Sequence, residues 1–114
     1  MRKEFREPIK DPSIFENEYF KVVYKEHTKT LYVKCNKLTF SHIDSWVHNI
    51  DIDGFTIEEW HNNETHGSTY EILPKKCHFF MYPDDLETDI QFISKEEFDK
   101  VKQRVINLLS DETF

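Results

Sequence analysis

The chain has 114 residues, 32% of them charged and 38% hydrophobic, with a formal net charge of −7 at pH 7, which fits a single folded domain and argues against disorder over most of its length. No apolar run approaches the roughly 18 residues that a membrane helix needs, and the charged first ten residues lack the apolar stretch of a signal peptide, so we expect a cytoplasmic protein with no membrane partner. The negative charge also disfavours nucleic acid as a partner.

The N-terminal part of the chain contains two prolines and charges of both signs over residues 1–17. We expect an arm or a docked coil there, because prolines fix the backbone and interrupt regular hydrogen bonding. A single α+β domain is then expected over residues 18–114.

The next two segments predict a β-hairpin. Residues 18–25 alternate in character, with Phe20, Val22 and Tyr24 on one face, and this period of two is typical of a strand. Residues 30–36 alternate in the same way, and the residues between the two runs have the composition of a turn.

The middle of the chain allows two structures. In one, a capping serine begins a short helix at 41–50. In the other, Asp53-Gly54 is the two-residue turn of a second hairpin, because both residue types tolerate a positive φ. That turn places Ile50 opposite Ile57 and brings the apolar residues of both strands to one face. The agreement between turn chemistry and pattern favours the hairpin.

Three further strands and a helix complete the domain. Strands are predicted at 68–73, 77–82 and 88–93, and prolines follow the first two. Ser94 caps the last helix, with Glu97 as its capping-box partner. The apolar stripe of this helix is formed by Phe98, Val101, Val105 and Leu108, and Ile106 and Leu109 widen it. The first four are expected to face the sheet.

These elements predict an α+β fold. About seven antiparallel strands in hairpin succession form a bent sheet or a partly closed barrel, and one C-terminal amphipathic helix covers it. The alternative is a smaller sheet with an extra short helix at 41–50. In the order of its elements, the predicted fold resembles the pleckstrin-homology-like superfold, a bent sheet of seven strands closed by a C-terminal helix. The tryptophan usual in the helix of that superfold is missing here, and the resemblance implies shape alone.

Charge is distributed unevenly along the chain. Residues 1–40 hold nine basic and six acidic residues, a net charge of +3, whereas residues 41–114 hold six and sixteen, a net charge of −10. No basic residue occurs between Lys37 and Lys75. Such a field favours basic partners or cations.

Acidic and aromatic residues of this window form the first candidate site. Strand alternation is expected to place them on an exposed face as one negative patch with an aromatic anchor, which is the anatomy of a protein interface. The expected partner-binding residues are Asp51, Glu58, Glu71, Trp46 and Trp60. The first functional hypothesis is therefore a non-catalytic acidic binding protein, of the inhibitor or immunity type, that covers a basic surface of another protein.

Histidines supply the second hypothesis, a metal- or small-ligand-dependent protein. In the hairpin register His48, His61 and Glu59 share a face, and two imidazoles with a carboxylate can bind zinc. However, no spacing in the chain matches a closed metal site. The segment 49–54 resembles the opening of an EF-hand loop, but Trp60 stands where the bidentate glutamate is needed. We therefore expect no bound metal and no other cofactor.

Lysines of the first hairpin supply the third hypothesis, an adaptor for a phosphate or lipid headgroup: Lys21, Lys25, Lys29, Lys34 and Lys37. The chain has no nucleophile elbow, P-loop or dinucleotide fingerprint, and its two glycines leave little material for a phosphate-cradling loop. This argues against an enzyme. Cys35 and Cys77 are expected to be reduced core residues.

Overall fold

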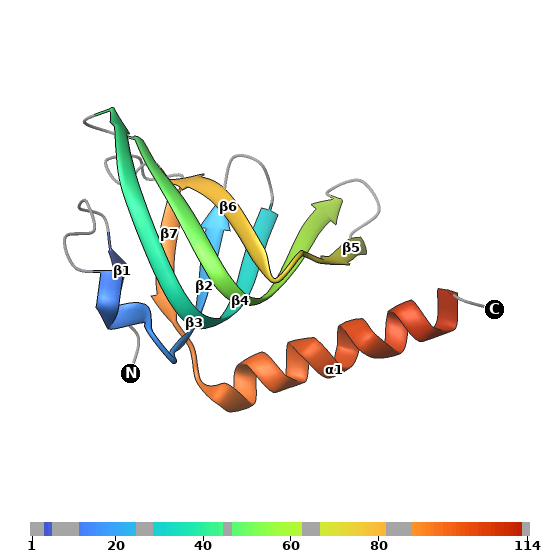
Figure 1. Ribbon diagram of the computed structural model, residues 1–114. Coiled ribbons are helices and arrows are strands. Elements are labelled where there is room, and N and C mark those ends of the chain that lie inside the picture. The colour runs from blue at the N-terminus through green and yellow to red at the C-terminus, as the bar shows by residue number, and fades with distance from the viewer. Residues whose placement is uncertain are drawn as a thin grey trace.

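The computed structural model describes residues 4–5, 12–24, 29–44, 47–62, 67–81 and 88–112. In these residues it has seven strands, a short 3-10 helix η1 (Pro12–Phe15) and one α-helix, α1 (Lys95–Glu112). Figure 1 shows how the strands and α1 are arranged. The strands are β1 (Glu4–Phe5), β2 (Tyr19–Tyr24), β3 (Lys29–Asp44), β4 (Val47–Asn62), β5 (Gly67–Ile72), β6 (Lys76–Met81) and β7 (Thr88–Phe92). The predicted α+β fold, a bent antiparallel sheet with one C-terminal helix, is confirmed.

The sheet has the order β1-β7-β2-β3-β4-β5, and β6 pairs with β4 beside β5. Every strand pair is antiparallel. The two long strands β3 and β4 curve together through the whole sheet (Figure 1). β5 and β6 pair with the two ends of β4 in one continuous register, since Ile57 faces Ile72 and Asp53 faces Lys76.

The predicted hairpin turn at Asp53-Gly54 is wrong, because β4 continues through both residues without a turn. The connection between β3 and β4 falls at residues 45–46, outside the described residues. Ile50 pairs with Phe40 of β3 and not with Ile57. The alternative short helix at 41–50 is also wrong, since the described residues of that range belong to β3 and β4.

Gly54 does not form a turn but allows the backbones of β3 and β4 to approach each other closely. A Cβ atom added at this position would lie 2.2 Å from the carbonyl oxygen of Lys34 on β3. The φ angle of Gly54 is not positive, so the residue needs no turn conformation. The absence of a side chain is what lets β3 and β4 pack here.

Both faces of the sheet are covered by apolar residues. The inner face carries the larger core, which includes Leu31, Val33, Ile50 and Ile52. The opposite face, called the helix face below, packs against α1 through a second cluster around Ile57. Apolar residues of β4 therefore change face between Ile52 and Ile57. A strand that is buried on both faces loses the simple alternation on which the predicted single-faced hairpin rested.

The N-terminal segment contributes to the inner core. Phe15 of η1 is fully buried, and its ring centroid lies 5.0 Å from that of Phe20 and 5.4 Å from that of Phe92. β1 also pairs with β7 at the edge of the sheet. The described parts of residues 1–17 thus form β1 and η1, while the division of the chain after residue 17 stays a prediction.

The helix begins as predicted. The backbone N–H of Glu97 donates to Ser94 Oγ at 3.0 Å, and Phe98, Val101 and Val105 are buried against the helix face. Leu108 is 42% exposed, so its predicted place against the sheet is wrong. Leu109 packs there instead, because it lies about three turns after Phe98 and returns to the same side of the helix.

No helix in the described part of the chain is both long and apolar enough to cross a membrane.

Candidate functional site

The predicted acidic patch is divided between the two faces of β4. Glu58 and Trp60 lie at even positions, on the inner face that also carries Ile52, whereas Asp51 lies at an odd position on the helix face. The prediction that Asp51, Glu58 and Trp60 share a face is therefore wrong. Glu71 of β5 is the direct cross-strand partner of Glu58 and shares its face. Trp46 lies outside the described residues.

Trp60 is 42% exposed and is held by its neighbours. Its indole Nε1 donates to Glu58 Oε1 at 2.6 Å. Lys29, the cross-strand partner of Trp60 on β3, places its Nζ 5.1 Å from the indole centroid and 3.9 Å from Glu58 Oε2. A tryptophan held by a carboxylate and a cation has little freedom to lose on binding. We call Lys29, Glu58, Trp60, Thr69 and Glu71 the Trp60 patch.

The structure places lysines beside the acidic residues of the basic-free window. Lys29 comes to Glu58 from β3, and Lys37 and Lys76 flank Asp53 from β3 and β6. Among the residues whose side chains the structure describes, eleven are acidic and ten are basic. The net negative charge of that part is thus small. Glu71 is exposed, and its partner in the strand register is Glu58.

The Trp60 patch borders a free sheet edge. β5 is the last strand in the sheet order, and no other described strand pairs with its outer edge. The N–H of Leu73 donates to the carbonyl of Thr56 at 2.9 Å. Because hydrogen-bonded and non-hydrogen-bonded pairs alternate in an antiparallel ladder, the N–H and C=O groups of Ser68, Tyr70 and Ile72 point away from β4. This edge can therefore accept an additional strand.

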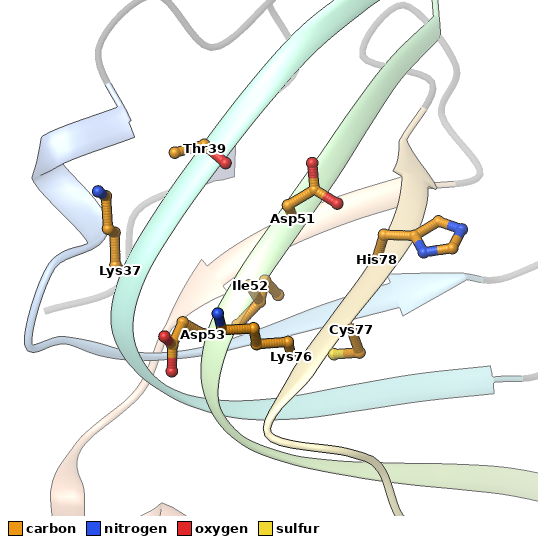
Figure 2. Close-up of a pocket in the computed structure, with 8 residues that line it drawn as sticks. All are labelled: Lys37, Thr39, Asp51, Ile52, Asp53, Lys76, Cys77 and His78. Atoms are coloured by element: carbon orange, nitrogen blue, oxygen red, sulfur yellow. The ribbon is translucent and has the colours of Figure 1, made fainter.

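Asp51 lies in a different place, an open groove across β3, β4 and β6 of about 590 Å³ (Figure 2). Strand pairing builds the groove from two rows of side chains. One row is Thr39, Asp51 and His78, and the other is Lys37, Asp53 and Lys76. One Oδ atom of Asp53 is buried without a hydrogen-bond partner among the described residues.

The groove mixes charges of both signs. Figure 2 shows the Asp51 carboxylate and the His78 imidazole extending from neighbouring strands, with two lysines at the other row. Two carboxylates and two ammonium groups give the lining no strong preference for either sign. The groove is therefore a weaker candidate for a basic partner than the Trp60 patch.

The predicted metal-binding set is not assembled. His61 Nε2 lies 3.4 Å from Glu59 Oε1, but His48 is thirteen residues away on the same strand, which at roughly 3.3 Å per residue is about 40 Å along β4. Within the described residues, no group of three histidine, cysteine, aspartate or glutamate side chains lies close enough to hold a metal ion.

Glu59 instead forms a buried polar cluster on the helix face. It is only 6% exposed and accepts hydrogen bonds from Tyr70 at 2.6 Å and from Tyr32 at 3.2 Å. Burial, followed by the nearby Glu59 carboxylate, raises the pKa of Tyr32. Burial and the hydrogen bond to Glu59 also raise the pKa of Tyr70. Both tyrosines therefore stay protonated and act as donors, which satisfies a charge that burial would otherwise penalise.

Sequence reasoning missed this cluster because its members come from three strands. Tyr32 belongs to β3 and Tyr70 to β5, and each is a close neighbour of Glu59 on β4 only through the strand register. Arg104 of α1 adds a hydrogen bond to Tyr70. The sequence offered one signal for the cluster: Glu59, an acidic residue, lies two positions after Ile57 and therefore on the same face of the strand.

The lysines of the first hairpin are dispersed. Lys21 lies 3.8 Å from Glu97 of the helix, and Lys29 belongs to the Trp60 patch. Lys34 and Lys37 are exposed on β3, and Lys25 lies outside the described residues. Both cysteines are free; Cys35 is buried, whereas Cys77, which was also expected in the core, is half-buried.

Comparison of the chain with protein-family models, with curated proteins and with solved structures found no match.

Proposed function

We propose that this chain is a non-catalytic binding protein, of the inhibitor or immunity type, whose Trp60 patch binds a basic segment of another protein. The observation that carries the proposal is the exposed indole of Trp60, held at 2.6 Å by Glu58 and flanked by the exposed carboxylate of Glu71. Large aromatic residues dominate the binding energy of protein interfaces. The adjacent carboxylates select lysine or arginine in the partner.

The free edge of β5 supports a particular mode of binding. An extended partner segment can pair with the outward N–H and C=O groups of Ser68, Tyr70 and Ile72. Its alternate side chains then lie on the face of Trp60 and Glu71. Main-chain pairing supplies affinity in this arrangement, and the basic side chains supply specificity.

The cytoplasm is the compartment that we propose for this function. Cys35 and Cys77 are both free, as expected where thiols are kept reduced.

The test begins with affinity capture of the partner from cells that make the protein, followed by binding kinetics on purified components. Trp60→Ala should weaken binding by about 2 kcal/mol or more, roughly 30-fold in Kd. Glu71→Gln should lower the on-rate and its dependence on salt. The matched control is Glu96→Gln, which removes an exposed carboxylate from the helix and should leave both quantities unchanged.

Ser68→Pro tests the edge directly. It removes one outward N–H and leaves the hydrogen bonds between β4 and β5 in place, so partner binding should fall while the melting temperature is preserved. Ser68→Ala controls for the lost hydroxyl. If the captured partner is not basic, or if it binds Trp60→Ala as tightly as wild type, the proposal is wrong.

A further inference from the structure

A second pocket, of about 400 Å³, opens on the helix face where β4 passes the β5–β6 connection. Its floor consists of Gly54, Phe55, Ile72 and Leu73, and its rim carries Lys34 and Lys75. The pocket is distinct from the groove of Figure 2, with which it shares no lining residue.

Backbone hydrogen bonds hold the walls of this pocket. The N–H of Gly54 donates to the carbonyl of Lys75 at 2.9 Å, and the N–H of Leu73 donates to the carbonyl of Thr56 at the same distance. Lys34 is the cross-strand partner of Phe55. The lysine rim and the apolar floor are therefore placed by strand pairing, which gives a site its geometry before a ligand arrives.

The floor leaves apolar surface accessible. Ile72 is 38% exposed and Phe55 is half-buried, whereas the half-buried Leu73 packs against the inner core. The Phe55 ring also packs on the helix, with its centroid 6.1 Å from that of Phe98. An apolar floor of this kind favours a ligand with a hydrocarbon or aryl portion.

The charges at the rim all have one sign. Lys34 and Lys75 are exposed, and a third ammonium, that of Lys102 on the helix, lies 4.8 Å from the Phe55 ring centroid. No acidic side chain is among the described residues that line the pocket. On the adjacent helix, Asp99 already pairs with Lys95 at 3.7 Å. The rim therefore attracts an anion, in contrast to the mixed groove.

We propose that this pocket binds a small amphipathic carboxylate. Its hydrocarbon or aryl tail lies on Phe55 and Ile72, and its carboxylate lies at the rim formed by Lys34 and Lys75. Charge-assisted hydrogen bonds to the ammonium groups fix the head, and burial of the floor stabilises the tail. The site does not depend on the Trp60 patch.

Octanoate is the probe, with octanol and octylammonium as neutral and cationic probes of the same chain length. Calorimetric titration should give saturable binding of octanoate, weaker binding of octanol and none of octylammonium. Amide NMR shifts should map the octanoate complex to residues 54–55 and 72–75. The Lys34→Met/Lys75→Met variant should lose about tenfold in octanoate affinity and retain its affinity for octanol.

The matched control is Lys37→Met/Lys76→Met, which removes two lysines from the same sheet but from the groove of Figure 2. It should bind octanoate like wild type, and so should Trp60→Ala, which separates this proposal from the one above. Thermal unfolding confirms that each variant folds. Equal affinity for octanoate and octanol, an unchanged affinity in Lys34→Met/Lys75→Met, or shifts that map elsewhere would each overturn the proposal.

Discussion

Gly54 on β4 lies so close to Lys34 on β3 that a Cβ atom at residue 54 would be 2.2 Å from the Lys34 carbonyl oxygen and 3.2 Å from the Cα atom of Cys35. Both neighbouring atoms belong to the backbone of a paired strand and cannot rotate away. The register shift of β3 between Cys35 and Lys37 lies beside this contact. The curvature of the two long strands therefore depends on a residue without a side chain.

Gly54→Ala should lower the free energy of unfolding by about 1–3 kcal/mol, because the added methyl group forces the two strands apart. Urea unfolding measures the change, and Ser68→Ala, at an exposed strand position, is the control. In an uncrowded strand the same substitution would stabilise the protein by roughly 0.5–1 kcal/mol, so a gain in stability would refute the close contact.

The two ends of the helix should differ in their contribution to stability. Phe98 is 1% exposed and packs against Tyr19 and Phe55, so Phe98→Ala should cost about 3–5 kcal/mol. Leu108 is 42% exposed, and Leu108→Ala should change stability by less than about 0.5 kcal/mol. Comparable losses in the two variants would place Leu108 against the sheet after all.

Stability should fall at alkaline pH because of Tyr32. Burial and Glu59 raise its pKa in the folded state above the ordinary value of 10.0. Below pH 10 both the folded and the unfolded states hold the proton, and the full stability is present. Above pH 10 the unfolded state loses the proton first, so the free energy of unfolding decreases as pH rises.

Tyr32→Phe should make that decrease shallower, although loss of the 3.2 Å hydrogen bond to Glu59 lowers stability by about 1 kcal/mol at neutral pH. Urea unfolding of both proteins at neutral pH and above pH 10 separates the two effects. Parallel pH profiles would show that Tyr32 ionises equally in the folded and unfolded states.

The two thiols should react at different rates. Cys35 is fully buried, and burial raises its pKa to about 12, so little thiolate is available. Cys77 is half-buried, its pKa is raised mainly by burial, and its thiol donates to Thr56 Oγ1 at 3.7 Å. Maleimide labelling of the native protein should therefore modify Cys77 first, as mass spectrometry of the peptides would show. Cys77→Ser should remove the fast phase, and equal labelling of both cysteines would contradict the assigned burial.

Short-range patterns identified the elements of this protein correctly where the interactions themselves are local. The cap at Ser94 is a bond between residues three apart, so spacing alone predicts it. The alternation of Phe20, Val22 and Tyr24 likewise predicted a buried strand face, and all three are in the inner core. The same holds for the buried part of the helix stripe, because a helix repeats its faces along the chain.

Asp53-Gly54 shows a limit of predicting structure from neighbouring residues alone. Glycine serves both a turn with positive φ and a close approach of two strands, and the residue type is the same in either case. The deciding contact, with the carbonyl of Lys34, joins positions twenty residues apart. Only the position of β3 distinguishes the two roles.

The acidic residues between Lys37 and Lys75 are divided between the two faces of the sheet for the same reason, that strand pairing joins positions far apart in the sequence. The sequence by itself determined that residues 38–74 lack a basic side chain, but the tertiary structure decided which charges meet. Strand pairing places Lys29 next to Glu58 and two tyrosines next to Glu59. Ile57 belongs to the second core, which the helix covers, and lies on the face opposite Ile52. Charge and burial act over a few ångströms in space, and in a sheet those neighbours are set by register rather than by distance along the chain.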